Sequence, residues 1–388
     1  MSLPRLASIV ISSYNYGGYL NDAIDSALGQ TYAETEVIVV DDGSTDHSRA
    51  VIAGYDGRLV SVLKENGGQA SSLNAGFAAS RGDVVVFLDS DDMLLPTAAE
   101  EAMALFRDPA VVKVHWPLLA VDGGGRKTGR VIPGSLLPEG DLRKAVISDG
   151  PYGYTWPDTS GNAWSRQFLE QVLPMPEAEY RTCPDLYLSA FVPLFGRIVR
   201  IADAQALYRD HGDNSSSRHP FVERAREGRV REDHCFGALA GYCREHGISV
   251  DPNRWKANSW WHQIERATND IIRLIQPGES FILVDEEHWG VGVDLAGRRR
   301  IPFLERDGAY IGEPDDDATA IQEVERLRGA GASFMVFGWP YLWWLDHYAA
   351  LRDHLHATFP CVLENDALVV FDLRRSIESD HSRSGPST

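Results

Sequence analysis

The sequence predicts an α/β protein whose main domain is a doubly wound sheet. Apolar runs that end in polar loops alternate with amphipathic or small-residue segments through the first hundred residues. The runs are continuous in Val, Ile and Leu, which is typical of strands that are covered on both faces. Ligands of such sheets bind beyond the carboxyl ends of the strands, so a site is expected in the loops that follow them.

Four strands and two helices are expected in this stretch. The strands, each counted with its following loop, are expected at residues 6–15, 35–46, 58–68 and 83–92. The amphipathic segment at 18–30 and the small-residue segment at 69–80 are expected to be helices. The loops after the strands read SSYNYGG, DDGSTD, ENGGQA and DSDD, so small or acidic residues gather along one rim.

The rest of the chain is expected to add a helical segment and a second α/β domain. A sequence of 388 residues exceeds one ordinary core, so two or three domains are expected. The pattern favours a first domain at 1–220, a helical segment at 221–276, a small C-terminal α/β domain at 277–376 and a disordered tail at 377–388. In the C-terminal domain, strands are expected at 280–290, 333–339 and 367–373, and helices at 317–331 and 341–359.

The composition is that of a soluble, acidic protein. The chain has 44% hydrophobic and 24% charged residues, and 37 Lys and Arg against 56 Asp and Glu give a net charge of −19. A field of that sign repels nucleic acid and anionic lipid, so no nucleic-acid partner is expected. The four cysteines are scattered, and neither a transmembrane segment nor a signal peptide is recognised. A cytoplasmic location is expected, with peripheral association at the inner membrane through partners as the variant.

Three carboxylates follow the apolar run at residues 84–88. Asp89, Asp91 and Asp92 occupy three of four positions, where their charges repel. Carboxylates at a strand end bind hard cations, and Mg²⁺ or Mn²⁺ takes one or two of them and leaves room for substrate phosphates. The motif therefore favours a divalent metal site on an exposed rim. The alternative, an acidic turn that caps the following helix, stays open on these residues alone.

Several motifs, in this order, resemble glycosyltransferase family 2 over residues 6–217. They are VISSYNYGGYLNDAIDSALGQTY, VIVVDDGSTD and ENGGQASSLNAGFAASRGDVVVFLDSDD, the last of which ends in a DXD motif. The resemblance implies the GT-A fold, a doubly wound mixed sheet that binds nucleotide-diphospho-sugars. It also implies an inverting, hexosyltransferase-like enzyme that uses Mn²⁺ or Mg²⁺ and moves a sugar from a nucleoside diphosphate sugar, with UDP-sugar favoured, to a hydroxyl acceptor.

The resemblance assigns residues to the donor side of the site. Those expected to line the nucleotide-sugar pocket are Ser13, Tyr14, Asn15, Asp42, Asn66, Gly67, Asn74, Asp89 and Ser90, with Asp42 on the base. Those expected at the metal are Asp91, Asp92 and His211, the last from the segment ALYRDHGDNSSS. One departure from the family is Leu73, which stands where many members have Arg before the Asn that Asn74 matches.

A later segment is expected to form the acceptor side. TSGNAWSRQFLEQVLPMPEAEYRTCPDLYLSAF resembles the family's acceptor region, and within it Asp185 matches the general base. That base takes the proton of the acceptor hydroxyl as its oxygen attacks the sugar. Asp185 also suits a helix N-terminus after Pro184, and the two roles are compatible. Tyr154, Trp156 and Trp164 are candidates for stacking on an acceptor sugar, with core packing as the alternative.

The acceptor and the wider role stay open at this level. A saccharide, a lipid-linked or a small-molecule hydroxyl acceptor fits, in polysaccharide, glycolipid or natural-product glycan biosynthesis. The C-terminal domain is expected to serve stability, assembly as a homo-oligomer, or acceptor presentation. A catalytically decayed nucleotide-sugar binding or scaffold protein is the non-enzymatic alternative. The haloacid dehalogenase phosphatases are disfavoured, because Met93 stands where they carry Thr or Val.

Overall fold

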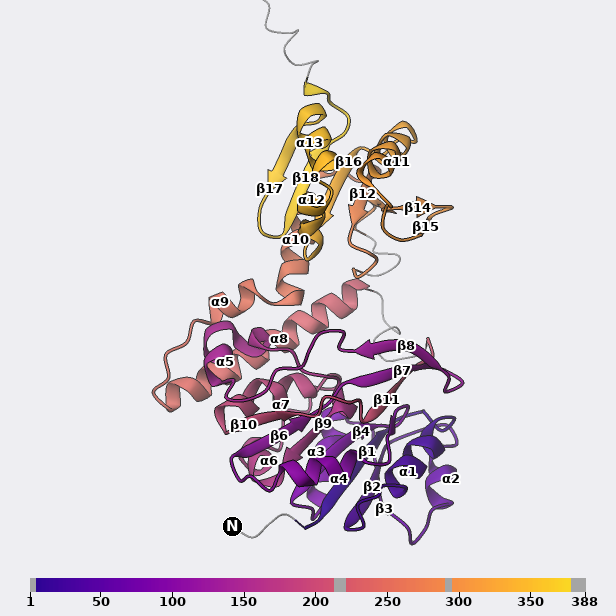
Figure 1. Ribbon diagram of the computed structural model, residues 1–388, viewed down its shortest axis with the longest axis vertical. Coiled ribbons are helices and arrows are strands. Elements are labelled where there is room, and N and C mark those ends of the chain that lie inside the picture. The colour runs from indigo at the N-terminus through magenta and orange to yellow at the C-terminus, as the bar shows by residue number, and fades with distance from the viewer. Residues whose placement is uncertain (1–4, 213–220, 290–294, 378–388) are drawn as a thin grey trace, which may run out of the picture. The chain divides into compact units, whose positions relative to one another are not determined.

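The computed structural model describes residues 5–212, 221–289 and 295–377 (Figure 1). The chain divides into two compact units, the first formed by residues 1–218 and 230–255 and the second by residues 219–229 and 256–388. The helical segment predicted at 221–276 is therefore divided between the units. The predicted disordered tail lies, from residue 378, outside the described residues. Among the helices of the described ranges, none has the length and apolar character to cross a membrane.

The first unit is built on a seven-stranded sheet with the order β10-β6-β9-β4-β1-β2-β3. Its strands are β1 Ala7–Ser13, β2 Thr35–Asp42, β3 Val60–Lys64, β4 Val84–Asp89, β6 Val111–His115, β9 Asn162–Ser165 and β10 Arg197–Arg200. Neighbouring strands are parallel except at β9, which pairs antiparallel with both β4 and β6. The doubly wound mixed sheet expected from the sequence is confirmed, and so are the four strands expected in the first hundred residues.

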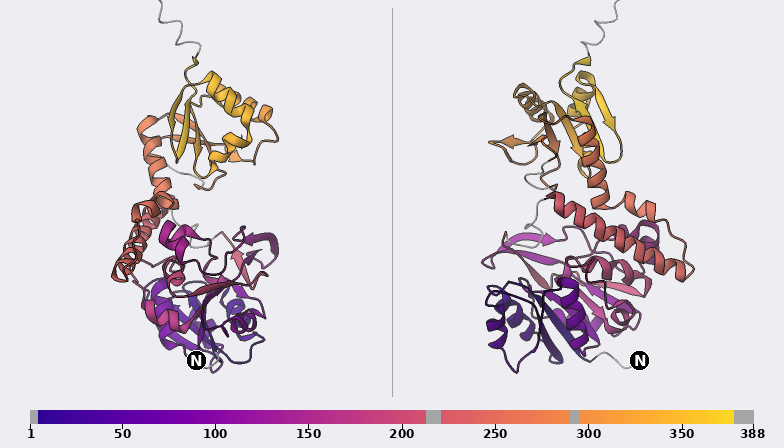
Figure 2. Two further views of the ribbon diagram at one scale, coloured as in Figure 1. Left: turned by 60° about the vertical axis from the view of Figure 1, so that its left-hand side comes forward. Right: turned by 180° about the vertical axis from the view of Figure 1, so that it is seen from behind.

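Helices cover both faces of this sheet and bury two apolar cores (Figure 2). On one face lie α1 Leu20–Leu28, α2 Ser48–Ala53 and α4 Ala98–Leu105. On the other lie α3 Gln69–Ala79, α5 Arg143–Asp149, α6 Arg166–Val172, α7 Asp185–Phe191, α9 Pro252–Ala257 and the part of α8 Phe221–Glu245 that belongs to this unit. Successive residues of a central strand enter different cores, as Val39 and Val40 do, so both faces of the strand are apolar.

A smaller sheet continues from the carboxyl end of β4. Its order is β5-β11-β7-β8, with β5 Met93–Leu94, β7 Leu118–Asp122, β8 Lys127–Ile132 and β11 Ala206–Asp210. Met93 and Leu94 pair antiparallel with Leu207 and Ala206. This pairing returns the residues after β11 to the acidic turn, residues 89–92, between β4 and β5. The irregular pattern between residues 97 and 220 gives no sign of this sheet in the sequence.

The second unit is the α/β module expected from the sequence. Its five-stranded sheet has the order β13-β12-β16-β18-β17, made of β12 Ser280–Val284, β13 Arg299–Pro302, β16 Phe334–Gly338, β17 Cys361–Glu364 and β18 Leu368–Asp372. The helices that pack on it are α10 Trp260–Leu274, α11 Asp317–Gly329, α12 Trp344–His347 and α13 Ala349–Thr358. β14 Glu305–Arg306 and β15 Ala309–Tyr310 form a small hairpin. The single helix expected at 341–359 is wrong, because the chain leaves the helical conformation at Tyr348, with φ −95° and ψ 71°.

Close packing in the first unit is expected to limit substitution at Gly76 of α3. A Cβ atom there would stand 2.1 Å from Val10 Cγ1 and 3.2 Å from Val40 Cγ2. We expect Gly76→Ala to lower stability by about 1–3 kcal/mol, because overpacking outweighs the gain in helix propensity. The control is Gly241→Ala in α8, where a Cβ would meet nothing within 4 Å, and this change should raise stability. Thermal unfolding measures both, and stabilisation by Gly76→Ala would contradict the packing.

Candidate functional site

The acidic turn holds three carboxylates that the fold largely removes from water. Asp92 is 2% exposed and Asp91 is 9% exposed, so the expectation of an exposed rim is wrong. Burial, followed by the charge of Asp91, raises the pKa of Asp89 and of Asp92 well above the usual value for a carboxyl. Asp185, on another segment, adds to the shift at Asp89. The turn therefore concentrates negative charge that a cation would relieve.

Asp91 and His211, both expected at the metal, lie side by side. The Nε2 atom of His211 is 3.2 Å from Asp91 Oδ2, and the imidazole is only 2% exposed. Its ring stacks on Tyr19 with 4.6 Å between centroids and meets Tyr16 edge-on at 5.5 Å. The pairing of β5 with β11 explains the contact, because it returns His211 to the turn that carries Asp91.

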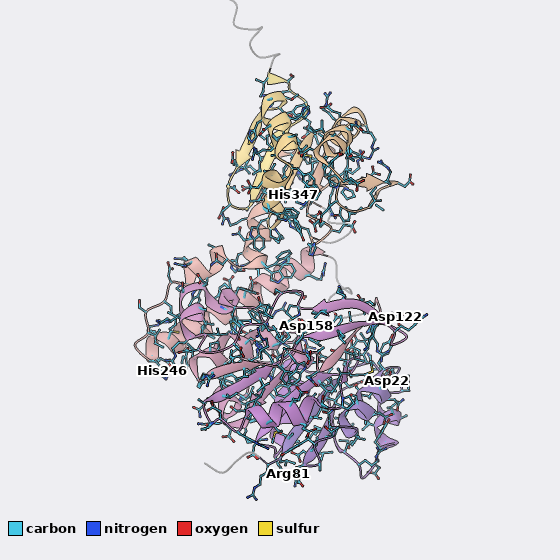
Figure 3. All side chains as sticks on the ribbon, viewed as in Figure 1. Asp22, Arg81, Asp122, Asp158, His246 and His347 are labelled. Carbon is cyan, nitrogen blue, oxygen red and sulfur yellow. The ribbon has the colours of Figure 1, made fainter. Side chains whose placement is uncertain are left out.

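Asp92, the third residue expected at the metal, is tied to the protein through both carboxylate oxygens. Oδ2 accepts a hydrogen bond from Ser160 Oγ at 2.7 Å, and Oδ1 accepts one from the Arg209 backbone N–H at 3.0 Å. The Arg209 guanidinium also donates to the Asp91 carbonyl at 3.0 Å and pairs at 2.6 Å with Asp22, which projects from α1 (Figure 3). Asp92 therefore holds the turn in place, which leaves Asp91 and Asp89 as the better placed metal ligands.

Asp42, expected to contact the nucleotide base, is engaged by a loop of the protein. Its carboxylate accepts hydrogen bonds from Lys64 Nζ at 2.6 Å, the Gly68 N–H at 2.7 Å, the Gly67 N–H at 2.9 Å and the Asn66 amide at 3.1 Å. These four donors fix the loop between β3 and α3. Asn66 and Gly67, also expected in the pocket, are thus positioned by Asp42 at the carboxyl end of the sheet.

Two of the expected pocket loops are pinned to each other. The Asn15 N–H donates to Ser44 Oγ at 3.0 Å, and the Asn15 side-chain oxygen accepts from the Thr45 N–H at 2.8 Å. Asn15 has φ 57°, a left-handed conformation that asparagine tolerates better than most residues. Its neighbour Tyr14 is left 40% exposed at this rim. Asn15 therefore shapes the loop, while Tyr14 is free to meet a ligand.

Three buried oxygens at the strand ends have no hydrogen-bond partner among the described residues, and they are Ser13 Oγ, Asp41 Oδ1 and Ser90 Oγ. Ser13 pairs in register with Asp41 across β1 and β2, so their side chains share one face of the sheet. Buried polar atoms are normally satisfied, so these oxygens are available to a polar partner from outside the chain. Ser13 and Ser90 are expected pocket residues. Sequence reasoning misses Asp41, although two successive aspartates at the end of a strand must face opposite sides.

Three other expected side chains have structural partners. Asn74 donates to the Met175 carbonyl at 2.9 Å and accepts from the Met175 N–H at 3.0 Å, so it fixes the loop between α6 and α7. Trp164 is 1% exposed and Tyr154 is 7% exposed, and the Tyr154 hydroxyl donates to the Ser189 carbonyl at 2.7 Å. The structure therefore does not bring Asn74 to the strand ends, and it places these two aromatic rings in the core.

Asp185, the expected general base, begins α7 and is half-buried. Burial raises the pKa of its carboxyl above the usual value, while the charges of Arg231 and Lys113 and a hydrogen bond from the Trp156 side chain act in the opposite sense. Trp156 is thus the one expected acceptor aromatic that reaches Asp185. A carboxylate with a raised pKa is a stronger base, which suits proton abstraction from a hydroxyl.

Gln69 joins the two halves of the site, and sequence reasoning misses it. Its amide nitrogen donates to Asp89 Oδ1 at 2.7 Å, and its side-chain oxygen accepts from the Cys183 N–H at 3.2 Å. Cys183 has φ 54° and precedes Asp185 by two residues. One side-chain amide therefore spans from the acidic turn to the segment that carries the base. Its place at the start of α3, directly after ENGG, is the signal that could have found it.

The residues at the turn fit a divalent cation that arrives with a phosphate ligand. Within the described ranges, no group of three or more His, Cys, Asp or Glu side chains could hold a metal ion by itself. Mg²⁺ typically needs only one or two carboxylates, with water and substrate phosphates as the other ligands. Asp89 and Asp91 supply oxygen ligands of that kind.

The fold and the site define an α/β protein that gathers buried oxygens and closely spaced carboxylates at the ends of its strands. Residues 8–148 match the family model described as glycosyl transferase family 2. An uncharacterized glycosyltransferase of Nostoc sp. is 37% identical over 216 residues, which cover 54% of this chain and 66% of that protein. One of Rickettsia prowazekii is 42% identical over 95 residues, which cover 24% of this chain and 30% of that protein. The crystal structure of S. aureus TarS 1–349 shows 17% identity and a TM-score of 0.48, over 69% of this chain and 74% of that chain.

The first unit therefore contains a region that matches glycosyl transferase family 2, and the chain carries an additional C-terminal region. It spans just under two thirds of the Nostoc relative and less than a third of the Rickettsia relative. The family model ends at residue 148, so its match does not include Asp185 or His211.

The aspartates that end β2 and β4, Asp42 and Asp89, are expected to respond in opposite ways to replacement by Asn. Burial and repulsion penalise the charged form of Asp89, so Asp89→Asn should make the metal-free protein more stable at neutral pH. Asp42→Asn should lower stability by about 2–3 kcal/mol, because its donors bond a charge. Thermal unfolding of both variants measures the contrast.

The pH dependence of the same measurement checks its cause. Because the folded pKa of Asp89 is raised, the stability that this group contributes is complete below the unfolded pKa and is lost as pH rises through the folded pKa. Asp89→Asn should weaken this loss, which begins as pH rises above the unfolded pKa of about 4. A variant that is less stable than the wild type at neutral pH would rule out repulsion as the dominant effect.

Proposed function

We propose that the first unit is a metal-dependent, inverting glycosyltransferase that moves a sugar from a nucleoside diphosphate donor to a hydroxyl acceptor. The observation that carries the proposal is the bridge made by the Gln69 side chain. Its amide bonds Asp89 of the acidic turn on one side, and on the other side it bonds the segment that carries a second carboxyl, Asp185. A cation site and a lone base are the two parts that a direct displacement on a phosphate-activated sugar needs. The match of residues 8–148 to glycosyl transferase family 2 supports the reaction class.

The nucleotide of the donor would lie across the ends of β1, β2 and β4. Ser13, Asp41 and Ser90 offer the buried oxygens that need polar partners, as the base and ribose of a nucleotide provide. Tyr14 presents an exposed ring beside them for stacking on the base. A carboxylate oxygen such as that of Asp41 suits a base that donates a ring N–H, as uracil does. A UDP-sugar is therefore the donor that we favour.

The diphosphate of the donor would lie at the acidic turn. Asp89 and Asp91 would hold a Mn²⁺ or Mg²⁺ ion, with His211 beside Asp91 as a third ligand or as a contact to phosphate. When bound, that ion would offset the charge of the diphosphate leaving group. Asp92 would keep the turn in shape through Ser160 and the Arg209 backbone.

Asp185 would act as the general base. The acceptor oxygen attacks the anomeric carbon from the face opposite to the diphosphate, the bond from that carbon to the diphosphate breaks, and the hydroxyl proton passes to the Asp185 carboxylate. Trp156 orients that carboxylate through its side-chain hydrogen bond. A single displacement without an enzyme nucleophile inverts the anomeric configuration.

The acceptor would approach Asp185 from the side of Trp156, whose partly exposed ring offers a face for a sugar. We propose that the acceptor is a saccharide, a lipid-linked or a small-molecule hydroxyl compound, and that the protein is cytoplasmic. For the second unit we propose a role in stability, homo-oligomer assembly or acceptor presentation.

The first test, which distinguishes an enzyme from a binding or scaffold protein, is incubation with a panel of nucleotide sugars and Mn²⁺. Slow hydrolysis of one donor supports the enzyme, and binding without hydrolysis or transfer supports the scaffold.

Asp91→Asn is expected to abolish Mn²⁺-dependent binding of UDP, because an amide is a much weaker ligand for a hard cation than a carboxylate. Titration calorimetry with and without Mn²⁺ measures this. Asp210→Asn is the matched control, since it removes a charge next to His211 from a solvent-exposed pair with Arg130 and should bind as the wild type does. Undiminished Mn²⁺-dependent binding by the Asp91 variant would exclude Asp91 from the metal site.

Asp185→Asn is expected to reduce transfer by about 10²- to 10⁴-fold with donor affinity little changed, because the amide keeps the shape of the side chain but cannot accept the proton. Asp158→Asn removes another carboxylate near Asp185 and should have a much smaller effect. The product of an α-linked donor should be β-linked, as read from the anomeric proton coupling by NMR. Retained configuration, or near-normal turnover of the Asp185 variant, would overturn the mechanism.

A further inference from the structure

Lys113 is a fully buried lysine that the reaction proposed above does not use. It lies in the middle of β6, all of whose residues are buried, and it is 0% exposed. Its Nζ atom is 3.3 Å from Ser189 Oγ, 4.6 Å from the centre of the Trp164 ring and 5.7 Å from the centre of the Tyr154 ring. Among the residues that the structure describes, no carboxylate forms a direct ion pair with it.

The ammonium group of Lys113 is unfavourable for folding in this position. Removal of a charge from water carries a large penalty, and one hydroxyl with two aromatic faces offsets only part of it. Burial accordingly lowers the pKa of Lys113 to about 7, and the charge of Asp185 opposes that shift. An apolar side chain of similar volume would fill the same space without the penalty. A role for the charge itself is therefore indicated.

The contacts of Lys113 lead along α7 to Asp185. Ser189 is four residues after Asp185, so the two side chains lie on one face of the helix, one turn apart. Tyr154, whose ring faces the ammonium group, donates its hydroxyl to the Ser189 carbonyl at 2.7 Å. Trp156 bonds Asp185 itself, and its ring centre is 5.6 Å from that of Tyr154. Lys113 is the buried cation behind the part of α7 that carries the base.

The other charged groups around Asp185 do not by themselves stabilise its carboxylate, so the ammonium group of Lys113 contributes. Asp89 and Asp158 both repel its charge. Arg231, which reaches it from α8, is also bound to Thr182, with 2.7 Å from its guanidinium to Oγ1. Asp89 and Asp158 therefore oppose ionisation of Asp185. Arg231 favours it from the side of α8, but its guanidinium is shared with the Thr182 hydroxyl.

The other titratable groups near Asp185 are neutral in the pH range in which Asp185 ionises. Burial lowers the pKa of His115, two residues along β6, to about 3. Burial raises the pKa of the Cys183 thiol to about 11, and it raises that of the Tyr154 hydroxyl far above its usual value. Lys113 is therefore the group on the buried side of α7 that carries charge below about pH 7.

We propose that Lys113 is a positioning residue, whose buried ammonium group keeps Asp185 ionised and holds its helix for proton abstraction. The inference rests on the proposed role of Asp185 as the base. Loss of the ammonium charge removes a stabilising interaction with the carboxylate, so the titration midpoint of Asp185 must move to higher pH. By reciprocity, loss of the Asp185 charge must move the midpoint of Lys113 to lower pH.

The test follows the ionisation of Asp185 directly, by carbon-13 NMR of the full chain labelled at the aspartate carboxyl carbons, with Asp185→Asn used to assign the signal. In Lys113→Met the midpoint of Asp185 should rise by about one pH unit, and Lys113→Arg, which keeps the charge, should restore it toward the wild-type value. The unfolding temperature of Lys113→Met should equal or exceed that of the wild type. An unchanged midpoint in Lys113→Met overturns the proposal, whatever the stability of the variant.

A second measurement needs no change at Lys113. The amine of Lys113, followed in lysine-labelled protein, should titrate near pH 7 in the wild type and at lower pH in Asp185→Asn. An unchanged Lys113 midpoint in that variant also overturns the proposal. Failure of the proposed function is read separately, because Asp185→Asn then retains transfer. If only this inference is wrong, Asp185→Asn still loses transfer, but the titrations of Lys113 and Asp185 no longer depend on each other.

Discussion

Repulsion among buried carboxylates is the constraint on which the rest of the first unit depends. The acidic turn places three aspartates in four positions, and burial makes the charge of two of them unfavourable. The fold answers with partners from separate segments, namely Gln69 of α3, Ser160 before β9, Arg209 of β11 and His211 after it. Because these partners come from three separate segments of the chain, the turn fixes how those segments meet. The smaller sheet brings Arg209 and His211 to the turn through the pairing of β5 with β11.

Neighbouring aspartates at the strand ends have different tasks, and the period of the strand assigns them. Asp41 and Asp42 face opposite sides of the sheet, so one meets the ends of β1 and β2 and the other meets the loop before α3. Asp42 stabilises the fold with its hydrogen bonds, whereas the Oδ1 atom of Asp41 has no hydrogen-bond partner among the described residues. The same division separates Asp92, which is anchored, from Asp91, which lies beside His211.

The sequence predicts the elements that depend on local pattern and misses the contacts that depend on distant pairing. The β/α alternation of the first hundred residues is local, and the strands and helices follow it. β9 is four residues long and pairs with β4 some eighty positions away, so no periodicity reveals it. Asn74 shows the same limit within the site, because its motif position says nothing of the Met175 loop that engages it. The hydrogen bond from the Cys183 N–H to Gln69 is of the same kind, because it joins two residues that are 114 positions apart.

The two halves of the site are coupled through charge as well as through hydrogen bonds. Ser160 Oγ accepts from the Asp89 N–H at 3.2 Å and donates to Asp92, so the segment before β9 is joined to the turn at two points. Asp89 and Asp185 repel each other, and a cation bound at the turn would remove that repulsion. Asp185 would then ionise at lower pH with a cation bound at the turn than without one.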